Sequence, residues 1–430
     1  MSVRLVLRSV LVLLSGMAVV FVAQSASAQN TRRAAVRFTS AGAHDTSFNN
    51  VSSNGGPGRL VQSAPGGNGT VFHDVVAFGN QTVYAGQQDK ALLVMRLGSN
   101  GRPDTSFGTN GVATASFAGI PGGTVTEAGA FGVAVDPLGG VIAAGYIIQN
   151  ALIKVAVARF TPQGALNTGF SGDGLVVTTV VSGLHSLAQA VKITSGDTIT
   201  VTGFTASGAN VFAIRYTNLG QLDANFGNAV PKDGIARISI PGAATPIAND
   251  MAIDSSSRIL IGGTVTVSGQ NVFAAWRLTS TGAADTAFSG DGFAAFWPNA
   301  TAKTNGIAAD GGKPVLVGEV GAPGSRQVGI LRLTTSGSTD STFDGDGWRL
   351  HNISGSSDEF ANDVLIGSSS SIVITGSAND GKVFSSRYNS SGSNTFLTSV
   401  DVVSGSTEAG QAVTVDTDGR FVVGGVAAAP

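Results

Sequence analysis

The sequence predicts an all-β fold, a seven-bladed β-propeller closed by a composite blade built from N- and C-terminal half-repeats. Three observations predict it. A glycine-closed apolar run occurs seven times, an arginine-led motif occurs seven times, and the chain begins with the second half of a repeat and finishes with the first half. The repeats recur about every 50 to 60 residues, a period typical of propeller blades rather than of the shorter solenoid repeats.

The first half of each repeat ends in an apolar run closed by glycine, such as "VIAAG" at 141–145. Short apolar runs bounded by turn residues are typical of buried strands. The closing glycines are Gly86, Gly145, Gly203, Gly263, Gly318, Gly376 and Gly425.

The second half of each repeat is led by an arginine that is followed five residues later by glycine. The seven arginines are Arg37, Arg96, Arg159, Arg215, Arg277, Arg332 and Arg387. An acid or amide stands eight residues after the first six of them, at Asp45, Asp104, Asn167, Asp223, Asp285 and Asp340. Phenylalanine stands eleven residues after the same six, at Phe48, Phe107, Phe170, Phe226, Phe288 and Phe343. The seventh copy departs from the pattern, with Thr395 and Phe396.

Each full unit is expected to form four short strands. In the unit that starts near Phe131, these are "GVAVD", "GVIAAGY", "IKVAVARF" and "GLVVTTV", separated by segments rich in Gly, Pro, Asn and Asp. Such residues favour tight turns. The strands are apolar on both faces, which fits sheets that are covered on both sides by neighbouring blades.

The domain organisation follows from the repeats. Residues 1–28 read as a signal peptide, with Arg4 and Arg8 before an apolar stretch and cleavage expected after Ala28; an uncleaved N-terminal anchor is the alternative. Residues 29–430 are expected to form a single propeller, with a half-blade at 34–63, six full repeats at 72–403 and a half-blade at 410–427. Pairing of the two halves would close the ring and leave no open edge.

Composition excludes several classes of function. The formal net charge is −2 with no basic run, so the chain has no electrostatic attraction to nucleic acid or anionic lipid. The absence of cysteine excludes disulfides, cysteine-ligated metals and cysteine nucleophiles. We therefore expect no nucleic-acid partner and, after signal cleavage, no membrane insertion.

The segment "VMRLGSNGRPDTSFGTNG" at 94–111 resembles the repeat of the delta-60 family, a bacterial propeller-like repeat of uncharacterised role. The resemblance covers nearly all of the mature chain, and the seventh copy departs from it. It implies a propeller and a bacterial exported protein, either secreted or periplasmic. It brings no catalytic residues to transfer.

The arginine column allows two interpretations. A ring of guanidinium groups could bind a polyanion, or each arginine could pair with the acid or amide eight residues later and hold the turn between them. The fixed spacing in an apolar strand favours the structural pair.

A second column stands at the start of each first strand, and five of its seven members are amides. Amides there could bind a sugar or peptide, or could tie the preceding loop to the strand. The structural role is favoured, and the candidate ligand-binding residues are His73, Gln189, Asn249, Asn305, Asn362 and Gln411, with Phe131 as the remaining member.

Catalytic residues cannot be assigned from any linear motif. Asp340, Asp344 and Asp346 are the closest approach to a calcium loop, but the equivalent loop elsewhere reads "GTNG" (108–111) without an acid. No metal and no cofactor are therefore expected, and calcium remains the alternative. A site is expected in the varied loops before the first strands, which carry the polar residues Glu127, His185, Asp358, Glu359 and Glu408.

The predicted function is that of a non-enzymatic binding or scaffolding module, monomeric, with a protein, peptide or glycan ligand. The alternative is a polysaccharide-active hydrolase or lyase that uses loop carboxylates. A surface structural or adhesive module is a third possibility.

Overall fold

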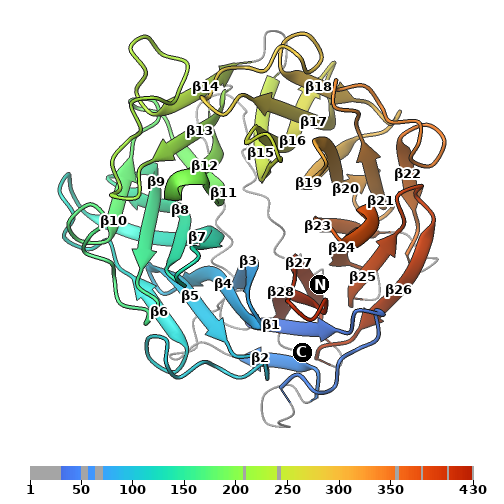
Figure 1. Cartoon of the computed structure of the whole chain (residues 1–430), viewed down its shortest axis with the longest axis horizontal. Coiled ribbons are helices and arrows are strands. Elements are labelled where there is room, and N and C mark those ends of the chain that lie inside the picture. The colour runs from blue at the N-terminus through green and yellow to red at the C-terminus, as the bar shows by residue number, and fades with distance from the viewer. Residues whose placement is uncertain are drawn as a thin grey trace.

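The structure, a computed structural model, describes residues 31–49, 57–62, 71–206, 210–239, 244–353, 358–378, 381–403 and 406–428. Seven four-stranded antiparallel sheets are arranged around a common axis (Figure 1). The predicted seven-bladed propeller is confirmed. The predicted signal peptide at 1–28 lies outside the described residues.

Each blade begins with its innermost strand and ends with its outermost strand (Figure 1). The innermost strands are β3 (Val71–Phe78), β7 (Val125–Val135), β11 (Ser186–Thr194), β15 (Ala244–Ile253), β19 (Ala302–Asp310), β23 (Phe360–Ile366) and β27 (Glu408–Val415). The second strands are β4 (Gln81–Gln88), β8 (Val141–Gln149), β12 (Thr198–Thr205), β16 (Ile259–Val267), β20 (Lys313–Val320), β24 (Ile372–Ser377) and β28 (Phe421–Ala428).

The third strands are β5 (Ala91–Leu97), β9 (Leu152–Phe160), β13 (Asn210–Tyr216), β17 (Gln270–Leu278), β21 (Gln327–Arg332), β25 (Val383–Tyr388) and β1 (Thr31–Phe38). The outermost strands are β6 (Val112–Ala115), β10 (Leu175–Thr178), β14 (Ile235–Ser239), β18 (Phe293–Phe296), β22 (Trp348–His351), β26 (Asn394–Val400) and β2 (Arg59–Gln62). We number the blades 1 to 6 from β3–β6 to β23–β26 and call β27, β28, β1 and β2 the composite blade.

The composite blade closes the ring as predicted. Its strand order is β2-β1-β28-β27, so β1 lies between β2 and β28. β1 and β28 pair over their full length, from Thr31 opposite Ala428 to Phe38 opposite Phe421. Strands from the two ends of the chain therefore hydrogen-bond within one sheet, which leaves no open side to the ring.

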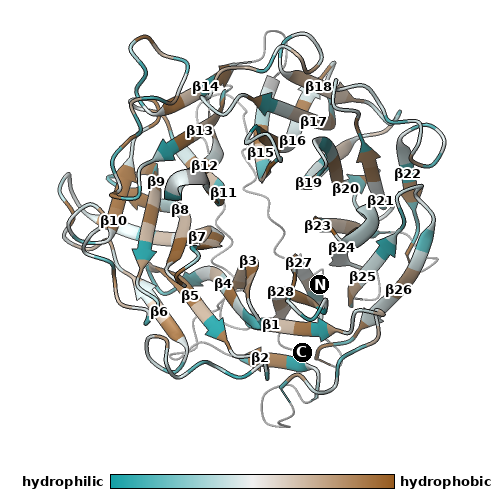
Figure 2. Cartoon of the chain, viewed as in Figure 1, coloured by the Kyte–Doolittle hydropathy of each residue, from teal (hydrophilic) through white to brown (hydrophobic). Residues whose placement is uncertain are grey.

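The core lies between the blades. Each of the seven blade-to-blade joints has its own cluster of buried apolar side chains, drawn from the facing sides of two sheets. Figure 2 shows hydrophobic residues along the strands and hydrophilic residues in many of the connecting turns. Strands that are apolar on both faces are required here because each sheet packs against a neighbour on each side.

The repeat glycines have a common structural reason. Each innermost strand carries a β-bulge, and the glycine of the second strand pairs with the residue just before it. A Cβ atom on any of these seven glycines would overlap a backbone carbonyl oxygen of the innermost strand. Glycine is required because the bulge pushes the backbone into the space that a side chain would occupy.

Candidate functional site

The propeller has two faces that differ in chemistry. We call the face on which the innermost strands begin the loop face, and the opposite one, which carries the arginine-led turns, the turn face. The arginine column lies beside the turn face and the amide column lies on the innermost strands.

Five arginines of the repeat form the expected ion pairs through their Nε atoms. The N–O distances are 2.7 to 2.9 Å, and the pairs are Arg37–Asp45, Arg96–Asp104, Arg215–Asp223, Arg277–Asp285 and Arg332–Asp340. Burial alone would raise the pKa of Asp340, but hydrogen bonds from Lys313 and Thr342 and the charge of Arg332 bring that pKa below its usual value.

The pair predicted between Arg159 and Asn167 is wrong. Arg159 instead pairs with Asp136, at 2.8 Å, in the turn after β7. The Asn167 side chain accepts a hydrogen bond from the Gly169 N–H at 3.0 Å. An amide offers no charge to a guanidinium, so the arginine turns to the nearest carboxylate.

Every arginine of the column also reaches the next blade. Its Nη1 donates to a backbone carbonyl in the next turn, at Ser99, Pro162, Asn218, Ser280, Thr335, Ser390 and Ser40. The phenylalanine of each repeat packs against the turn glycine of the next blade, including Phe396 of the irregular seventh copy against Gly42. The turn face is thus a ring of joints between blades, and these arginines are occupied by it.

The amide column coincides with the β-bulges. Three asparagines form clasps to the next innermost strand: the Nδ2 groups of Asn249, Asn305 and Asn362 donate to the carbonyls of Thr304, Ala361 and Gly410 at 2.5, 2.8 and 2.8 Å. All three side chains are buried. At these positions the geometry fits a structural role that differs from the one proposed from the sequence, because the amide joins two blades rather than a loop and a strand.

The other four members of the column stand on consecutive blades, from the composite blade to blade 3. We call Gln411, His73, Phe131 and Gln189 the open sector, because none of them makes an asparagine clasp. The two ends of the Gln411 amide are buried and have no hydrogen-bond partner among the residues that the structure describes. The His73 ring lies 4.7 Å from the Phe131 ring.

A polar cluster flanks Phe131 toward the loop face. The Tyr146 hydroxyl donates to Glu127 Oε1 at 2.5 Å, and Gln87 Nε2 donates to the same oxygen at 3.3 Å. The Phe131 and Tyr146 rings stack at 5.7 Å. Burial and the Glu127 carboxylate raise the pKa of Tyr146. An aromatic face beside a carboxylate and an amide is a surface that binds hydroxyl-bearing or peptide groups.

Most of the loop carboxylates named from the sequence serve the fold. Asp358 pairs with Arg326 at 2.5 Å, and Arg326 also pairs with Glu319 at 2.8 Å. Glu359 and Glu408 are completely buried and accept hydrogen bonds from backbone N–H groups of the preceding loops, at Ile353 and at Val402 and Val403. His185 Nδ1 accepts from the Ile153 N–H at 3.1 Å, and burial lowers its pKa.

The buried Glu408 carboxyl group is expected to make the free energy of unfolding depend on pH. Burial raises its pKa from 4.5 to about 7, against the hydrogen bonds from Val402, Val403 and Ser406. Between these two values the folded protein binds the proton more tightly than the unfolded chain does, so the free energy of unfolding is expected to fall as pH rises. The loss over this window is on the order of 3 kcal/mol.

Urea denaturation at several pH values checks this prediction. Glu408→Gln is expected to remove that part of the pH slope, and Glu359→Gln controls for the loss of a buried backbone acceptor at the equivalent position. An unchanged slope in Glu408→Gln would show that another group is responsible.

The three aspartates of the candidate calcium loop point to different partners. Asp340 binds Arg332 and Lys313, Asp344 binds Arg349, and Asp346 accepts the Trp348 N–H. Within the described ranges, no group of three or more His, Cys, Asp or Glu residues is placed to hold a metal ion.

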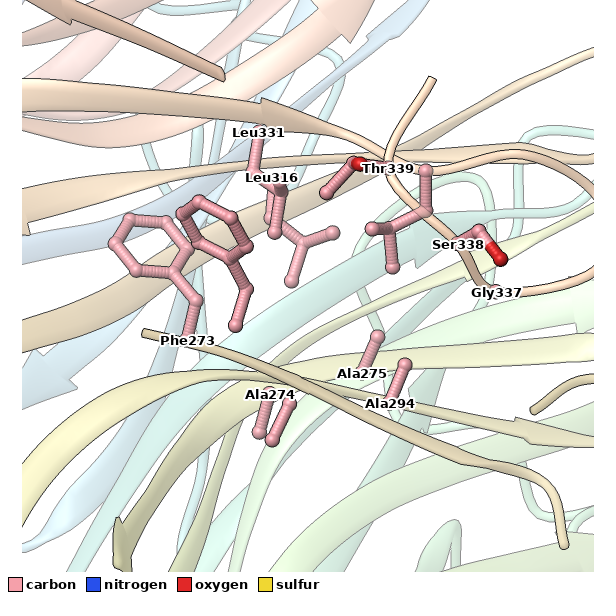
Figure 3. A pocket seen from close by; sticks show the side chains of 12 residues that line it. Phe273, Ala274, Ala275, Ala294, Leu316, Leu331, Gly337, Ser338 and Thr339 are labelled. Atoms are coloured by element: carbon pink, nitrogen blue, oxygen red, sulfur yellow. The ribbon is translucent and has the colours of Figure 1, made fainter. Parts of the chain in front are cut away.

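A small cavity of about 180 Å³ lies at the joint of blades 4 and 5 (Figure 3). Phe273, Leu316 and Leu331 line it together with several alanines, and its polar groups come from Ser338 and Thr339. Its lining comes from β17, β18, β20 and β21 and from the turn after Leu333, and it contains no residue of the open sector.

The sequence reasoning missed Tyr146, which stacks on Phe131, and Gln87, which donates to Glu127. It also missed Arg326 and Glu319, which hold Asp358. Charged or amide residues near the ends of apolar second and third strands are the signal that could have found them. In the part of the chain that the structure describes, no helix is long and apolar enough to span a membrane.

The profile of the family described as a domain of unknown function (DUF5122) β-propeller matches residues 255–288 and 312–343. The match supports a propeller-repeat family of unknown function. No curated protein matches the sequence.

Solved structures with a similar arrangement include Sqt1 of Chaetomium thermophilum bound to the N-terminus of the ribosomal protein L10. It has a TM-score of 0.42 and 11% identity, over 84% of this chain and 96% of that chain. A gluconolactonase of Xanthomonas campestris gives 0.34 and 12% identity, over 71% and 82%. The GH43 endo-arabinanase of Bacillus licheniformis gives 0.33 and 11%, over 67% and 94%. Similarities of this size carry no information about activity or ligand.

Proposed function

We propose that this protein is an exported, non-enzymatic binding module that takes a protein, peptide or glycan ligand at the open sector. One observation carries the proposal. The bulge column forms asparagine clasps on blades 4, 5 and 6 and changes to Gln411, His73, Phe131 and Gln189 on the other four blades. If the column had only a structural role, we would expect the asparagine clasp on every blade.

The chemistry of the open sector supports ligand binding rather than catalysis. Phe131 offers an apolar face, and Glu127 and Gln87 stand beside it with acceptor and donor groups. The other named loop acids, Asp358, Glu359 and Glu408, are engaged in ion pairs or backbone hydrogen bonds. This supports binding over a reaction that needs two available carboxylates.

Arrays of glycans and peptides test the proposal, with the mature chain from Gln29 as the probe and with calcium or chelator present. Phe131→Ala is expected to weaken a saturable hit by roughly tenfold or more, because truncation of an aromatic anchor removes a large share of binding energy. Leu138→Ala is the matched control. Leu138 is 85% exposed and lies in the turn at the far end of the same strand.

A hit that Phe131→Ala leaves unchanged would show that the ligand binds outside the open sector. If the protein degrades a polysaccharide and Glu127→Gln abolishes that activity, the enzyme alternative holds and the binding-module proposal is wrong. Loss of the hit in chelator would favour the calcium alternative.

The remaining features belong to the same proposal. We infer that the repeats are of the delta-60 type, and that the protein is secreted or periplasmic after cleavage behind Ala28. It acts as a monomer, without a nucleic-acid partner or membrane insertion. The weak net charge and the absence of a basic run support the last two points.

A further inference from the structure

The joint between the composite blade and blade 1 contains a buried guanidinium group without a carboxylate partner. Arg33, on β1, is 4% exposed. Its Nε donates to Gln62 Oε1 at 3.2 Å, and its Nη1 is buried without a hydrogen-bond partner. Among the described residues, no carboxylate forms an ion pair with Arg33. Burial lowers the pKa of Arg33 to about 10.

Arg33 and Gln411 face the same part of blade 1. The Arg33 guanidinium lies 5.9 Å from the centre of the Phe72 ring. In the asparagine clasps, the bulge side chain reaches the carbonyl of the residue before the next bulge. For Gln411 that carbonyl belongs to Phe72, yet neither end of the Gln411 amide has a partner. Ala412, the residue after Gln411, packs in the same apolar cluster as Phe72.

A second amide belongs to this joint. Gln88 Oε1, on β4, is also buried without a partner. A Cβ atom on Gly424 of the composite blade would lie 2.9 Å from the Tyr84 ring, so Tyr84 faces that blade. Side chains alternate along a strand, so Gln88, four residues later, faces it as well.

These groups have the composition of a binding site rather than of a core. Proteins pair buried charges and satisfy buried amides, because an unpaired one costs stability. Six of the seven arginines of the repeat column show the paired arrangement, as Arg277 does with Asp285 at 2.7 Å. One cation without a carboxylate and two incompletely bonded amides in one joint leave donors and acceptors that a ligand can use.

We propose that this joint binds an acidic saccharide, with Arg33 at the carboxylate of a uronic acid and with Gln411 and Gln88 at its hydroxyls. The proposal rests on the proposed function, because Gln411 belongs to the open sector. The planar guanidinium fork matches a carboxylate, and an amide supplies a donor and an acceptor to neighbouring hydroxyls. A neutral peptide is less suited, because it offers the Arg33 guanidinium no carboxylate.

Calorimetric titration tests the proposal, with oligomers of galacturonate, glucuronate and mannuronate and a neutral galactose oligomer as probes. The wild-type protein is expected to bind at least one uronate oligomer and to leave the neutral one unbound. Arg33→Met and Gln411→Leu are each expected to weaken that binding by about tenfold or more. Both variants are expected to melt at the wild-type temperature or above it, because each removes an unpaired buried polar group.

The combination of lost binding and retained stability distinguishes a ligand site from a structural one. Arg33→Lys keeps the charge without the fork and is expected to bind more weakly than wild type and more tightly than Arg33→Met. Uronate binding that Arg33→Met leaves intact, or equal binding of the neutral oligomer, would overturn the site.

Other outcomes separate this inference from the proposed function. Binding that is lost in Phe131→Ala but kept in Arg33→Met would support the open sector as a binding surface. It would overturn the role of Arg33. Binding of an acidic peptide in place of every uronate, with loss in Arg33→Met, would overturn the saccharide class. Failure of all uronate probes to bind the wild-type protein would overturn it as well.

Discussion

Replacing Gly203 with alanine is expected to destabilise the protein by more than about 4 kcal/mol. The new Cβ would overlap the Leu187 carbonyl oxygen in the β11 bulge and would lie 2.7 Å from the Phe212 ring. The overlapping atom is backbone, so the strain can be relieved only by separating β11 from β12. The free energy of unfolding from urea titration measures the effect.

Gly169→Ala is the matched control. Gly169 is exposed, and the nearest atom to its new Cβ would be the Asn167 side-chain oxygen at 3.1 Å. We expect a change within about 0.5 kcal/mol, typical of surface positions. Equal effects at the two glycines would mean that the bulge does not explain the repeat glycine.

Arg277→Ala is expected to cost about 3 to 5 kcal/mol, because it removes the buried partner of the Asp285 carboxylate and leaves that carboxylate only Arg258, at 3.7 Å. The Arg277 side chain is completely buried, pairs with Asp285 at 2.7 Å and donates to the Thr335 carbonyl of the next blade. Its guanidinium also lies 4.8 Å from the centre of the Phe288 ring. Thermal and urea unfolding should both report the loss.

Arg387→Ala tests the same repeat position without the ion pair. Its Nε donates to the Thr395 hydroxyl at 3.3 Å, and its Nη1 donates to the Ser40 carbonyl at 3.1 Å. With a neutral, exposed partner we expect a cost of about 1 kcal/mol. A cost as large as that of Arg277→Ala would assign the stabilisation to the contact with the next blade, since that contact is common to both arginines.

The fold was predictable because each blade repeats the same local signals. The glycine and arginine columns set the blade count, and the half-repeats at the two ends predicted that β1 and β28 share a sheet. What local signals do not contain is the contact between consecutive blades. The carbonyls that accept from Arg96 and Arg277 lie about 60 residues away from them, and no spacing rule reaches that far.

The bulges explain why the amide column could be found in the sequence but the contacts of its side chains could not. Asn249, Asn305 and Asn362 recur at one position, so the pattern was clear from the residues. The extra residue in the strand that turns each side chain toward the next blade depends on register, which sequence alone leaves open. Arg159 was paired wrongly for a different reason. The repeat pattern predicted Asn167 as its partner, whereas its actual partner, Asp136, lies outside that pattern.

The candidate site was predicted only in part. His73, Gln189 and Gln411 were identified by their column. The stacking of Tyr146 on Phe131 depends on the register of β7 and β8, and Gln87 reaches Glu127 only because blades 1 and 2 are in contact. Arg33 could not be singled out, because a charged residue in an apolar strand gives no sign of whether it has a partner.

During synthesis, the composite blade cannot form until β28 has been made. β1 is made early, and its partner β28 is made after six complete blades. At roughly 5 to 20 residues per second, synthesis of the intervening segment takes about 20 to 80 s. During that interval one edge of β1 has no neighbour, and a chain interrupted before β28 keeps that edge open. Closure of the ring therefore requires synthesis of β28, and products shortened before β28 carry a strand edge that aggregation and proteases can act on.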